Sequence, residues 1–391
     1  MTMAADKQDK VLNVPNLRFP EFSGEWGKYK VSDVLDFYST NSLSWDQLDY
    51  NSDELLNLHY GLIHVGLPTV VNLDENVLPN IKKEFLPKNY ELCREGDVAF
   101  ADASEDTNEV AKAIEFVNLS DKNVVCGLHT IHGRDNHNLT SIGFKGYSFA
   151  SESFHNQIRR IAQGTKIFSI SSKNFNECYM GIPSKDEQTK IAKLLALIDE
   201  RISTQSRIID KLQSLMKGLA EHLTAFTPNT KIADCLNCHS SILQENQVKN
   251  EGKYKVYGAN GICGYNDSPA ILEDAILIVK DGSGVGNVSY ASGEYSVIGT
   301  SNYLTAKSGY SLKYLYFCLM IFNFVPYRTG MAIPHIYFKD YGKALIPCPS
   351  LNRQKQIATL LSKIECKIET EKTITESYLQ QKRFLLKSMF I

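Results

Sequence analysis

A glycine-rich stretch between residues 278 and 290 has the residue types of a phosphate- or cofactor-binding loop. In IVKDGSGVGNVSY the glycines alternate at positions 282, 284 and 286, after a run of β-branched residues. Such a loop holds a phosphate, or the methionine end of S-adenosylmethionine, when a helix N-terminus follows it. The residues that follow are NVSYASGEYSVIG, which predict a strand, a turn and a second strand. We therefore expect a strand-connecting turn, which could still offer backbone N–H groups to a phosphate.

Two other short patterns imitate reactive centres. CLNCH places Cys235, Cys238 and His239 in the spacing of a c-type haem attachment site, but the start of the chain, MTMAADKQDKVLNVPN, has no export signal. A zinc site would need a second ligand pair, and there is no second C-x-x-C. The tripeptide EGK at 251–253, with Asp234 upstream, resembles part of a nuclease centre but is common by chance. We expect no metal site from these residues.

The motifs of two further chemistries are absent from the sequence. There is no Asn/Asp-Pro-Pro-aromatic tetrapeptide of an amino-methyltransferase and no G-x-x-x-x-G-K-[ST] phosphate-binding loop. The nine cysteines are scattered, which favours buried thiols over disulfides. The sequence thus predicts a chain without catalytic residues.

Length and composition indicate a globular protein of more than one domain. The chain has 391 residues, of which 43% are hydrophobic and 22% are charged. No apolar run approaches the roughly 20 residues that span a bilayer, so we expect a cytoplasmic protein without a membrane partner. The net charge of −2 argues mildly against a nucleic-acid binder but does not exclude one, because local basic surfaces can be offset elsewhere.

The chain contains a long internal repeat. PSKDEQTKIAKLLALIDERI begins at Pro183, and PSLNRQKQIATLLSKIECKI begins 166 residues later, at Pro349. The same offset aligns GTKIFSI with GMAIPHI, matching Gly164 with Gly330 and Ile167 with Ile333. The matched apolar positions of the longer phrases are Ile191, Leu194, Leu195, Ile198 and Ile202 in the first copy and Ile357, Leu360, Leu361, Ile364 and Ile368 in the second.

These apolar positions predict two long paired helices. Their spacing of i, i+3, i+4, i+7 and i+11 marks one helix face, and residues 186–223 contain no proline. A helix of that length is roughly 55 Å long, and the second copy runs from about residue 352 to the C-terminus. A long helix with one narrow apolar stripe pairs with another, so we expect an antiparallel coiled coil.

A globular block precedes each long helix, and both blocks have strand-like runs between glycine- and asparagine-rich turns. The predicted fold is α+β: two mixed α/β domains separated by two long helices, with an approximate two-fold relation within one chain. The boundaries that we expect are a flexible N-terminus (1–15), domain 1 (16–182), helix 1 (183–225), domain 2 (226–348) and helix 2 (349–391).

Several of these phrases resemble the specificity subunit of type I restriction–modification systems. LRFPEFSGEW (17–26) is similar to the opening phrase of such subunits, and the two helix starts resemble their two helical spacers. VVCGLHTI (124–131), YKVYGANGICGYND (254–267) and VKDGSGVGNVSYASGEYSVIGTSNYL (279–304) resemble parts of their two target-recognition domains. The resemblance covers nearly the whole chain beyond residue 15.

The resemblance implies a non-catalytic DNA-recognition subunit. Each recognition domain would read one half of a bipartite target in double-stranded DNA, and the helices would set the gap between the halves. Two modification subunits would dock and methylate adenine, and two restriction subunits would add translocation and cleavage. The chain itself would need no cofactor, because S-adenosylmethionine, ATP and Mg²⁺ would bind to the partner subunits.

Segments that differ between the two halves are the candidates for reading different half-sites. Arg and Lys suit guanine, whereas Asn and Gln suit adenine. The candidate DNA-binding residues are His129, His132, Arg134, Asn136, Lys145, Arg159 and Arg160 in the first block, and Tyr257, Asn260, Lys280, Ser283, Asn287, Ser301, Asn302 and Arg328 in the second. Arg159 and Arg160 could equally face a modification subunit.

Segments that match between the halves are assigned to helix pairing or to identical partners. These are the helical stripes together with Gly164, Ile167, Gly330 and Ile333. Two other functions stay open at this point: an S-adenosylmethionine-dependent enzyme that uses the loop at 282–286, and a coiled-coil scaffold that does not bind DNA.

Overall fold

The structure is a computed structural model that describes residues 13–51 and 54–391. The chain forms two compact units. Unit 1 comprises the residues up to Thr204 together with Ile374–Ile391, and unit 2 comprises Gln205–Thr373. Most of the N-terminus predicted to be flexible lies outside the described residues. Within the described part of the chain, no helix has both the length and the apolar composition needed to cross a membrane.

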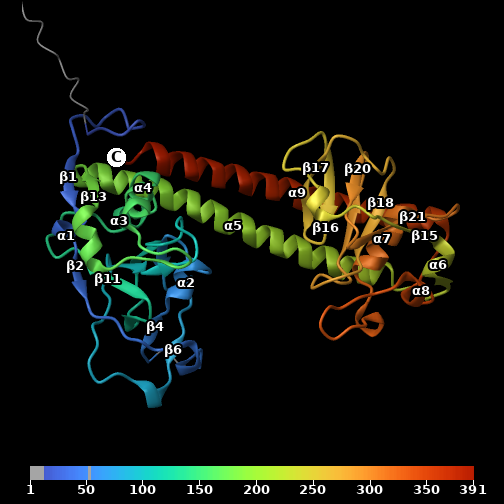
Figure 1. The fold of residues 1–391 in the computed structure, drawn as a ribbon, viewed down its shortest axis with the longest axis horizontal. Helices are drawn as coiled ribbons and strands as arrows, with labels where there is room; N and C mark the ends of the chain where they lie inside the picture. The colour runs from blue at the N-terminus through green and yellow to red at the C-terminus, as the bar shows by residue number, and fades with distance from the viewer. Residues whose placement is uncertain (1–12, 52–53) are drawn as a thin grey trace, which may run out of the picture. The chain divides into compact units, whose positions relative to one another are not determined.

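The two predicted long helices are present. They are α5 (Lys185–Leu223) and α9 (Leu351–Ser388), and they lie side by side (Figure 1). In unit 1, Lys382 of α9 is 2.6 Å from Asp199 of α5. In unit 2, Gln205 of α5 donates a hydrogen bond to Glu371 of α9. Rising residue numbers along α5 therefore meet falling numbers along α9, so the pair is antiparallel, as predicted.

Gln205 and Glu371 are also equivalent positions of the sequence repeat, because they are 166 residues apart. Two equivalent residues contact each other when they lie at a local two-fold axis. The antiparallel pairing thus brings equivalent positions of the two helices into contact.

The repeated apolar stripes are mostly buried. Ile191, Leu195 and Ile198 lie in the core of unit 1, and Leu194 and Ile202 pack against it. In the second copy, Ile357, Leu361 and Ile368 are buried, Ile364 is partly buried and Leu360 is 46% exposed. The prediction of a buried interface is therefore confirmed for most of these positions, and Leu360 is the exception because it faces solvent.

Unit 1 contains two main sheets. The five-stranded sheet has the order β2-β11-β7-β9-β5, and the four-stranded sheet has the order β10-β4-β6-β3. The strands of the first are β2 (Asp36–Tyr38), β5 (Val70–Asn72), β7 (Val98–Ala101), β9 (Ala113–Asn118) and β11 (Thr130–Arg134). Those of the second are β3 (Leu48–Asp49), β4 (Leu56–Leu58), β6 (Asn80–Ile81) and β10 (Val124–Cys126).

Two short ladders and four helices complete unit 1. The ladders pair β1 (Gly27–Lys30) with β13 (Tyr179–Ile182) and β8 (Ala103–Ser104) with β12 (Phe168–Ser169). The helices are α1 (Val31–Val34), α2 (Tyr60–His64), α3 (Phe144–Phe149) and α4 (Glu152–Ile161).

Unit 2 is smaller. One sheet has the order β15-β21-β18-β19, with β15 (Leu236–Ser240), β18 (Ala275–Val279), β19 (Val288–Ala291) and β21 (Ser301–Ala306). The other has the order β17-β16-β20, with β16 (Tyr254–Gly258), β17 (Gly261–Asn266) and β20 (Tyr295–Val297). The remaining elements are the ladder of β14 (Thr230–Lys231) with β22 (Leu345–Ile346), and helices α6 (Ile232–Cys235), α7 (Leu312–Met320) and α8 (Phe338–Tyr341).

The two units share one framework. The antiparallel order β2-β11-β7-β9 in unit 1 corresponds to β15-β21-β18-β19 in unit 2. The parallel pair β4–β10 corresponds to β16–β20, and the ladder β1–β13 corresponds to β14–β22. The domain middles therefore share a strand order even though their sequences differ in length and content.

A buried glutamine explains the repeated phrase P-S-x-x-x-Q. The side chain of Gln188 accepts a hydrogen bond from the Ser141 amide at 2.6 Å and donates to the Pro183 carbonyl at 2.9 Å. Gln354 likewise accepts from the Ser311 amide at 3.0 Å and donates to the Pro349 carbonyl at 2.8 Å. Each glutamine thus joins the start of a long helix to the domain that precedes it.

The opening phrase LRFPEFSGEW packs against the ends of both long helices. Arg18 forms two hydrogen bonds of 2.7 Å with the carboxylate of Glu187, in the first turn of α5. Trp26 is buried, and its ring centroid lies 6.5 Å from that of Phe390, just after α9. The first and last described segments of the chain therefore contribute to one core.

The glutamine contacts predict a measurable loss of stability. Gln354→Ala removes the hydrogen bonds that Gln354 makes with the half-buried Ser311 amide and Pro349 carbonyl, which costs about 0.5–1.5 kcal/mol for each bond. We expect a lower urea midpoint for the full chain and faster amide hydrogen exchange in α7 and the first turns of α9. Gln356→Ala, an exposed position on the same helix, is the control and should change stability by less than about 0.5 kcal/mol. Equal midpoints for the two variants would contradict this role.

Candidate nucleic-acid interface

The glycine-rich loop connects two antiparallel strands. It runs from β18 to β19, and a strand rather than a helix follows it. Gly282 and Gly286 have φ angles of 95° and 90°, which glycine adopts without strain. The prediction of a strand–turn–strand is therefore confirmed. Among the described residues, the amides of Ser283 and Gly284 have no hydrogen-bond partner, so they remain free to donate to a ligand.

A second hairpin, residues 329–335, leans on this loop. The backbones of Thr329 and His335 exchange hydrogen bonds of 2.9 and 2.7 Å, and the Gly282 amide donates to the Pro334 carbonyl at 3.0 Å. Asp281 lies 2.7 Å from His335 Nδ1 and 2.7 Å from Lys280 Nζ. Burial raises the pKa of Asp281, but the hydrogen bonds from Lys280 and His335 outweigh it and hold that pKa below its ordinary value.

Further polar groups converge at the same place. Arg328 donates to the Val285 carbonyl at 2.8 Å, is exposed, and has no acidic partner among the described residues. Asn287 and Asn260 are also exposed, and a Cβ built on Gly284 would lie 3.8 Å from the carbonyl of neighbouring Ala259. We call residues 258–261, 280–287 and 328–335 the glycine-loop edge of unit 2. It combines an exposed guanidinium that has no acidic partner among the described residues, amide side chains, and the two unpaired backbone amides of Ser283 and Gly284.

Unit 1 has a counterpart of this edge. The Asp102 amide donates to the His129 carbonyl at 3.1 Å, as the Lys280 amide donates to Thr300 at 2.9 Å. A hairpin at 163–169 is closed by the same pair of backbone hydrogen bonds as 329–335, and Ile170 and Ile336 donate to the equivalent residues Asp102 and Lys280. We call residues 102–112, 127–129 and 163–169 the counterpart edge.

The counterpart edge carries different side chains. His129 is exposed, and its Nδ1 lies 3.1 Å from Asp102 Oδ1. Arg159, on α4 and outside these ranges, contacts the edge because it donates to Asn108 Oδ1 at 2.6 Å, and it is also exposed. Both edges contain an imidazole beside an aspartate and a guanidinium, but they come from different positions. The imidazole is His129 in unit 1 and His335 in unit 2, and the guanidinium comes from α4 in unit 1 and from Arg328 in unit 2.

The two hairpin tips are matched and exposed. Ile167 is 60% exposed and Ile333 is 59% exposed. Gly164 and Gly330 both have positive φ, and a Cβ at either would collide with the carbonyl oxygen three residues later. These four residues lie outside the helix pair. A contact with an identical partner stays a prediction for them.

Five of the residues predicted to touch DNA are buried, which corrects their assignment to the surface. They are His132, Arg134, Lys145, Ser301 and Asn302. A buried side chain holds the domain together and cannot reach a base from the folded state. Arg134 forms a salt bridge of 2.8 Å with Asp97, and its other amino group lies 2.6 Å from Glu91. Burial raises the pKa of Asp97, but hydrogen bonds from His132 and Arg134 outweigh it and lower that pKa below its ordinary value.

The other three buried residues, Lys145, Asn302 and Ser301, also lie inside their domains. Lys145 Nζ lies 3.0 Å from Glu115, and both side chains are buried. Burial raises the pKa of Glu115, and the charge of Lys145 offsets this only in part. Asn302 accepts a hydrogen bond from Ser240 at 2.9 Å, and Ser301 is the first residue of β21.

The remaining predicted residues lie apart from the two edges. Asn136 is exposed and donates to Asp36 and to the Tyr38 hydroxyl, both at 2.7 Å. Tyr257 is half-buried, with its ring against that of Tyr295.

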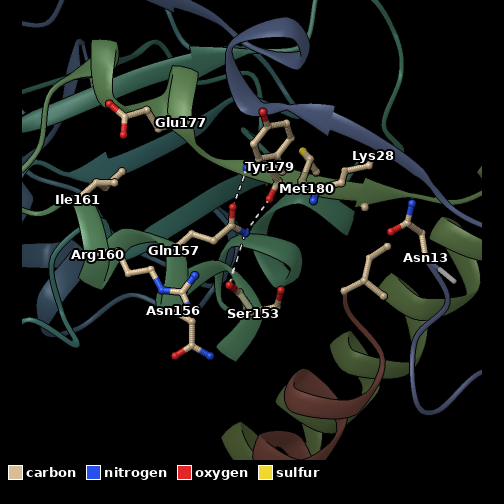
Figure 2. A pocket seen from close by; sticks show the side chains of 12 residues that line it. Asn13, Lys28, Ser153, Asn156, Gln157, Arg160, Ile161, Glu177, Tyr179 and Met180 are labelled. Atoms are coloured by element: carbon tan, nitrogen blue, oxygen red, sulfur yellow. Dashed lines mark hydrogen bonds between the residues drawn. The ribbon is translucent and has the colours of Figure 1, made fainter. Parts of the chain in front are cut away.

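Arg160 lines a cavity of about 530 Å³, whereas Arg159 is not among its lining residues (Figure 2). The cavity lies beside the β1–β13 ladder and is also lined by Lys28, Asn156 and Tyr179. Gln157 spans its wall, with hydrogen bonds to the Tyr179 amide and carbonyl at 2.8 and 2.9 Å. The two adjacent arginines therefore serve different surfaces.

Sequence reasoning missed Asp102, Asn108, Asp281 and His335 as members of the two edges. The sequence did contain a signal for the hairpins, because GTKIFSI and GMAIPHI align at the repeat offset. Their contact with the strand-connecting loops depends on hydrogen bonds between distant residues, which that alignment does not reveal.

Comparisons with known proteins show sequence similarity in the second half of the chain. Residues 230–377 match the model of the type I restriction modification DNA specificity domain. A Mycoplasma genitalium protein whose name describes a type I specificity subunit is 28% identical over 197 residues, which cover 45% of this chain. That match spans about half of the relative's length, namely 50%.

Solved structures share the fold. The crystal structure of a type I restriction–modification S subunit from M. genitalium aligns with a TM-score of 0.60 at 18% identity, covering 97% of this chain and 99% of that one. A structure described for complex assembly and conformational transition of the type I R-M system aligns with a TM-score of 0.53 at 14% identity, covering 92% and 96%. Over residues 230–377 the chain is thus similar in sequence to type I restriction–modification specificity domains, and it shares the fold of two solved structures from type I restriction–modification systems.

Proposed function

We propose that this chain is the DNA sequence-specificity subunit of a type I restriction–modification complex, in which each unit reads one half of a bipartite target. The observation that carries the proposal is the repeated framework with two different edges. Because the framework is repeated, both units could dock on DNA in the same geometry. Because the side chains at the two edges differ, each unit could read a different half-site.

The chemistry of the edges fits contact with DNA. Arg328 can pair with guanine or with a phosphate, and Asn260 and Asn287 can pair with adenine. The free amides of Ser283 and Gly284 can donate to a phosphate without reading sequence. In unit 1, His129 and Arg159 are the corresponding groups. The side chains would thus provide sequence specificity, and the backbone amides would position the unit on the DNA.

The paired helices would set the gap between the half-sites. At 1.5 Å per residue, the 39 residues of α5 extend roughly 58 Å. Successive major grooves on one face of DNA are ~34–36 Å apart. A stiff helix pair of this length is therefore long enough to set such a spacing.

Partner subunits would supply the chemistry. Two modification subunits would dock and methylate adenine with S-adenosylmethionine, and two restriction subunits would add ATP- and Mg²⁺-dependent cleavage in the cytoplasm. The cavity beside β1–β13 and a cavity of about 480 Å³ beside β14–β22 occupy related places in the framework. We propose them as docking places for the modification subunits, with Arg160 in the first.

The alternative of an S-adenosylmethionine-dependent enzyme loses its structural basis, because β19 takes the place of the required helix after Gly286. A scaffold that does not bind DNA is the remaining alternative. It differs from the proposal in one measurable respect, which is salt-sensitive DNA binding in the presence of the modification subunit.

Exchange of one block tests the two-reader proposal. We expect that replacing residues 229–347 with the equivalent block of another family member changes one half-site only. The gap should stay constant, because α5 and α9 are untouched. Adenine-methylation mapping in cells that also express the modification subunit measures both quantities, and co-purification with that subunit controls for assembly. A change in both half-sites would refute two independent readers, and a changed gap would refute the helical spacer.

Charge removal at the glycine-loop edge tests the DNA contact. Arg328→Ala should weaken binding and reduce the slope of log affinity against log salt by about one unit, as expected for the loss of one phosphate contact. Lys280→Ala should have a smaller effect, because Asp281 already neutralises that charge. Arg353→Ala, an exposed position at the start of α9, is the control. The measurement is a titration of DNA with the complex at several salt concentrations. An unchanged slope of log affinity against log salt for Arg328→Ala would place this edge away from DNA.

A further inference from the structure

Two thiols and one imidazole meet in the interior of unit 1. One ligand atom from each of Cys93, Cys126 and His132 lies within 4.8 Å of the other two, and all three residues are buried. The two sulfur atoms are 3.6 Å apart. The three residues are separated in sequence, so no C-x-x-C spacing reveals them.

The histidine has one ring nitrogen without a partner. His132 Nε2 lies 2.7 Å from Asp97 Oδ2. His132 Nδ1 is buried, and it has no hydrogen-bond partner among the described residues. A buried polar atom without a partner is rare because it is costly, so this nitrogen is available to bind a ligand.

The contact with Asp97 is the one that metal-binding histidines make. A histidine ligand usually donates its other ring N–H to a carboxylate, which fixes its orientation. Asp97 is itself held in place by Arg134 at 2.8 Å and by the Arg94 amide at 2.8 Å. The imidazole is therefore pre-oriented by groups that do not belong to the three-residue cluster.

The donor set and the sulfur separation fit zinc. Two thiolates and an imidazole are soft ligands, which favour Zn²⁺ over Mg²⁺ or Ca²⁺. With Zn–S bonds of about 2.3 Å, tetrahedral geometry places two sulfurs ~3.8 Å apart, close to the 3.6 Å observed. A disulfide would need about 2.05 Å. Two thiolates also neutralise a divalent ion, as its burial requires.

We propose that Cys93, Cys126 and His132 bind a zinc ion in unit 1, with Asp97 orienting the imidazole and a water molecule in the fourth position. Cys126 ends β10 of the four-stranded sheet, and His132 lies in β11 of the five-stranded sheet. Cys93 is joined to β10 by the hydrogen bond from its amide to the Val124 carbonyl, at 2.8 Å. The ion thus ties the two sheets of unit 1 together.

The proposed zinc ligands also flank a residue that is predicted to contact DNA. Residues 127–131 lie between the ligands Cys126 and His132, and they include the exposed His129, whose φ is 56°. Zinc fixes both ends of this turn. Its effect on DNA reading rests on the proposed function, whereas the presence of the metal does not.

Metal content of the full chain is the direct test. The chain is purified without chelator and its zinc is measured by mass spectrometry. We expect about one zinc ion per chain. Replacement by Co²⁺ should give the intense visible bands of tetrahedral cobalt together with a thiolate-to-metal charge-transfer band.

Variants locate the ion. Cys93→Ser, Cys126→Ser and His132→Asn should each lose the zinc and the cobalt spectrum. Cys348→Ser is the matched control, because Cys348 is a free cysteine of unit 2 that lies outside the Cys93–Cys126–His132 cluster, and it should keep both. Circular dichroism checks that each variant is folded. If a ligand variant does not fold, the zinc content and the cobalt spectrum of the wild-type chain test the proposal.

Three results would overturn the proposal: a wild-type chain without zinc and without a cobalt–thiolate spectrum, zinc retained by the Cys93→Ser/Cys126→Ser double variant, or a Cys93–Cys126 disulfide in freshly purified chain. Loss of DNA binding in a chain that keeps its zinc would count against the proposed function and leave the metal site intact.

Discussion

Both cores depend on the packing of α5 against α9. Ile191 and Leu195, at the start of α5, share a core with Leu385 and Met389, at the end of α9. In unit 2 the roles reverse, because Leu219, near the end of α5, packs with the core that contains Ile357 and Leu361. A helix with a single apolar stripe is stable only when that stripe is covered. The antiparallel pairing covers both stripes and lets each unit use one half of each helix.

This dependence explains why the repeated sequence phrases lie at the starts of the two long helices. Gln188 and Gln354 secure the helix starts to their domains, and the equivalent ladders β1–β13 and β14–β22 lead the chain in and out of each domain. Both glutamine side chains are buried and use their amide groups fully, so few replacements can keep these contacts. The edges carry exposed side chains, which can change without disturbing the framework. The same fold can therefore present different chemistry twice.

Burial removes several residues from the set predicted to contact DNA. Lys145 and Arg134 have the residue type of a DNA contact, yet each neutralises an acid in the interior of unit 1. Lys280 is half-buried and paired with Asp281, which leaves Arg328 as the stronger cation of the glycine-loop edge. The same interior brings Cys93, Cys126 and His132 together as the proposed zinc site. Residue type indicates what a side chain can do, and burial decides where it does it.

The amino-acid sequence by itself determined the two long helices, their pairing and the turn at Gly282–Gly286. Helical periodicity and turn chemistry are properties of neighbouring residues, so they can be read without a structure. Only the tertiary structure decided the strand order shared by the two units, the hairpins that lean on the loops and the burial of His132. These depend on residues far apart along the chain, such as Asp97 and His132, which are 35 positions apart and meet at 2.7 Å. A local pattern does not contain such a contact, because folding of the intervening chain creates it.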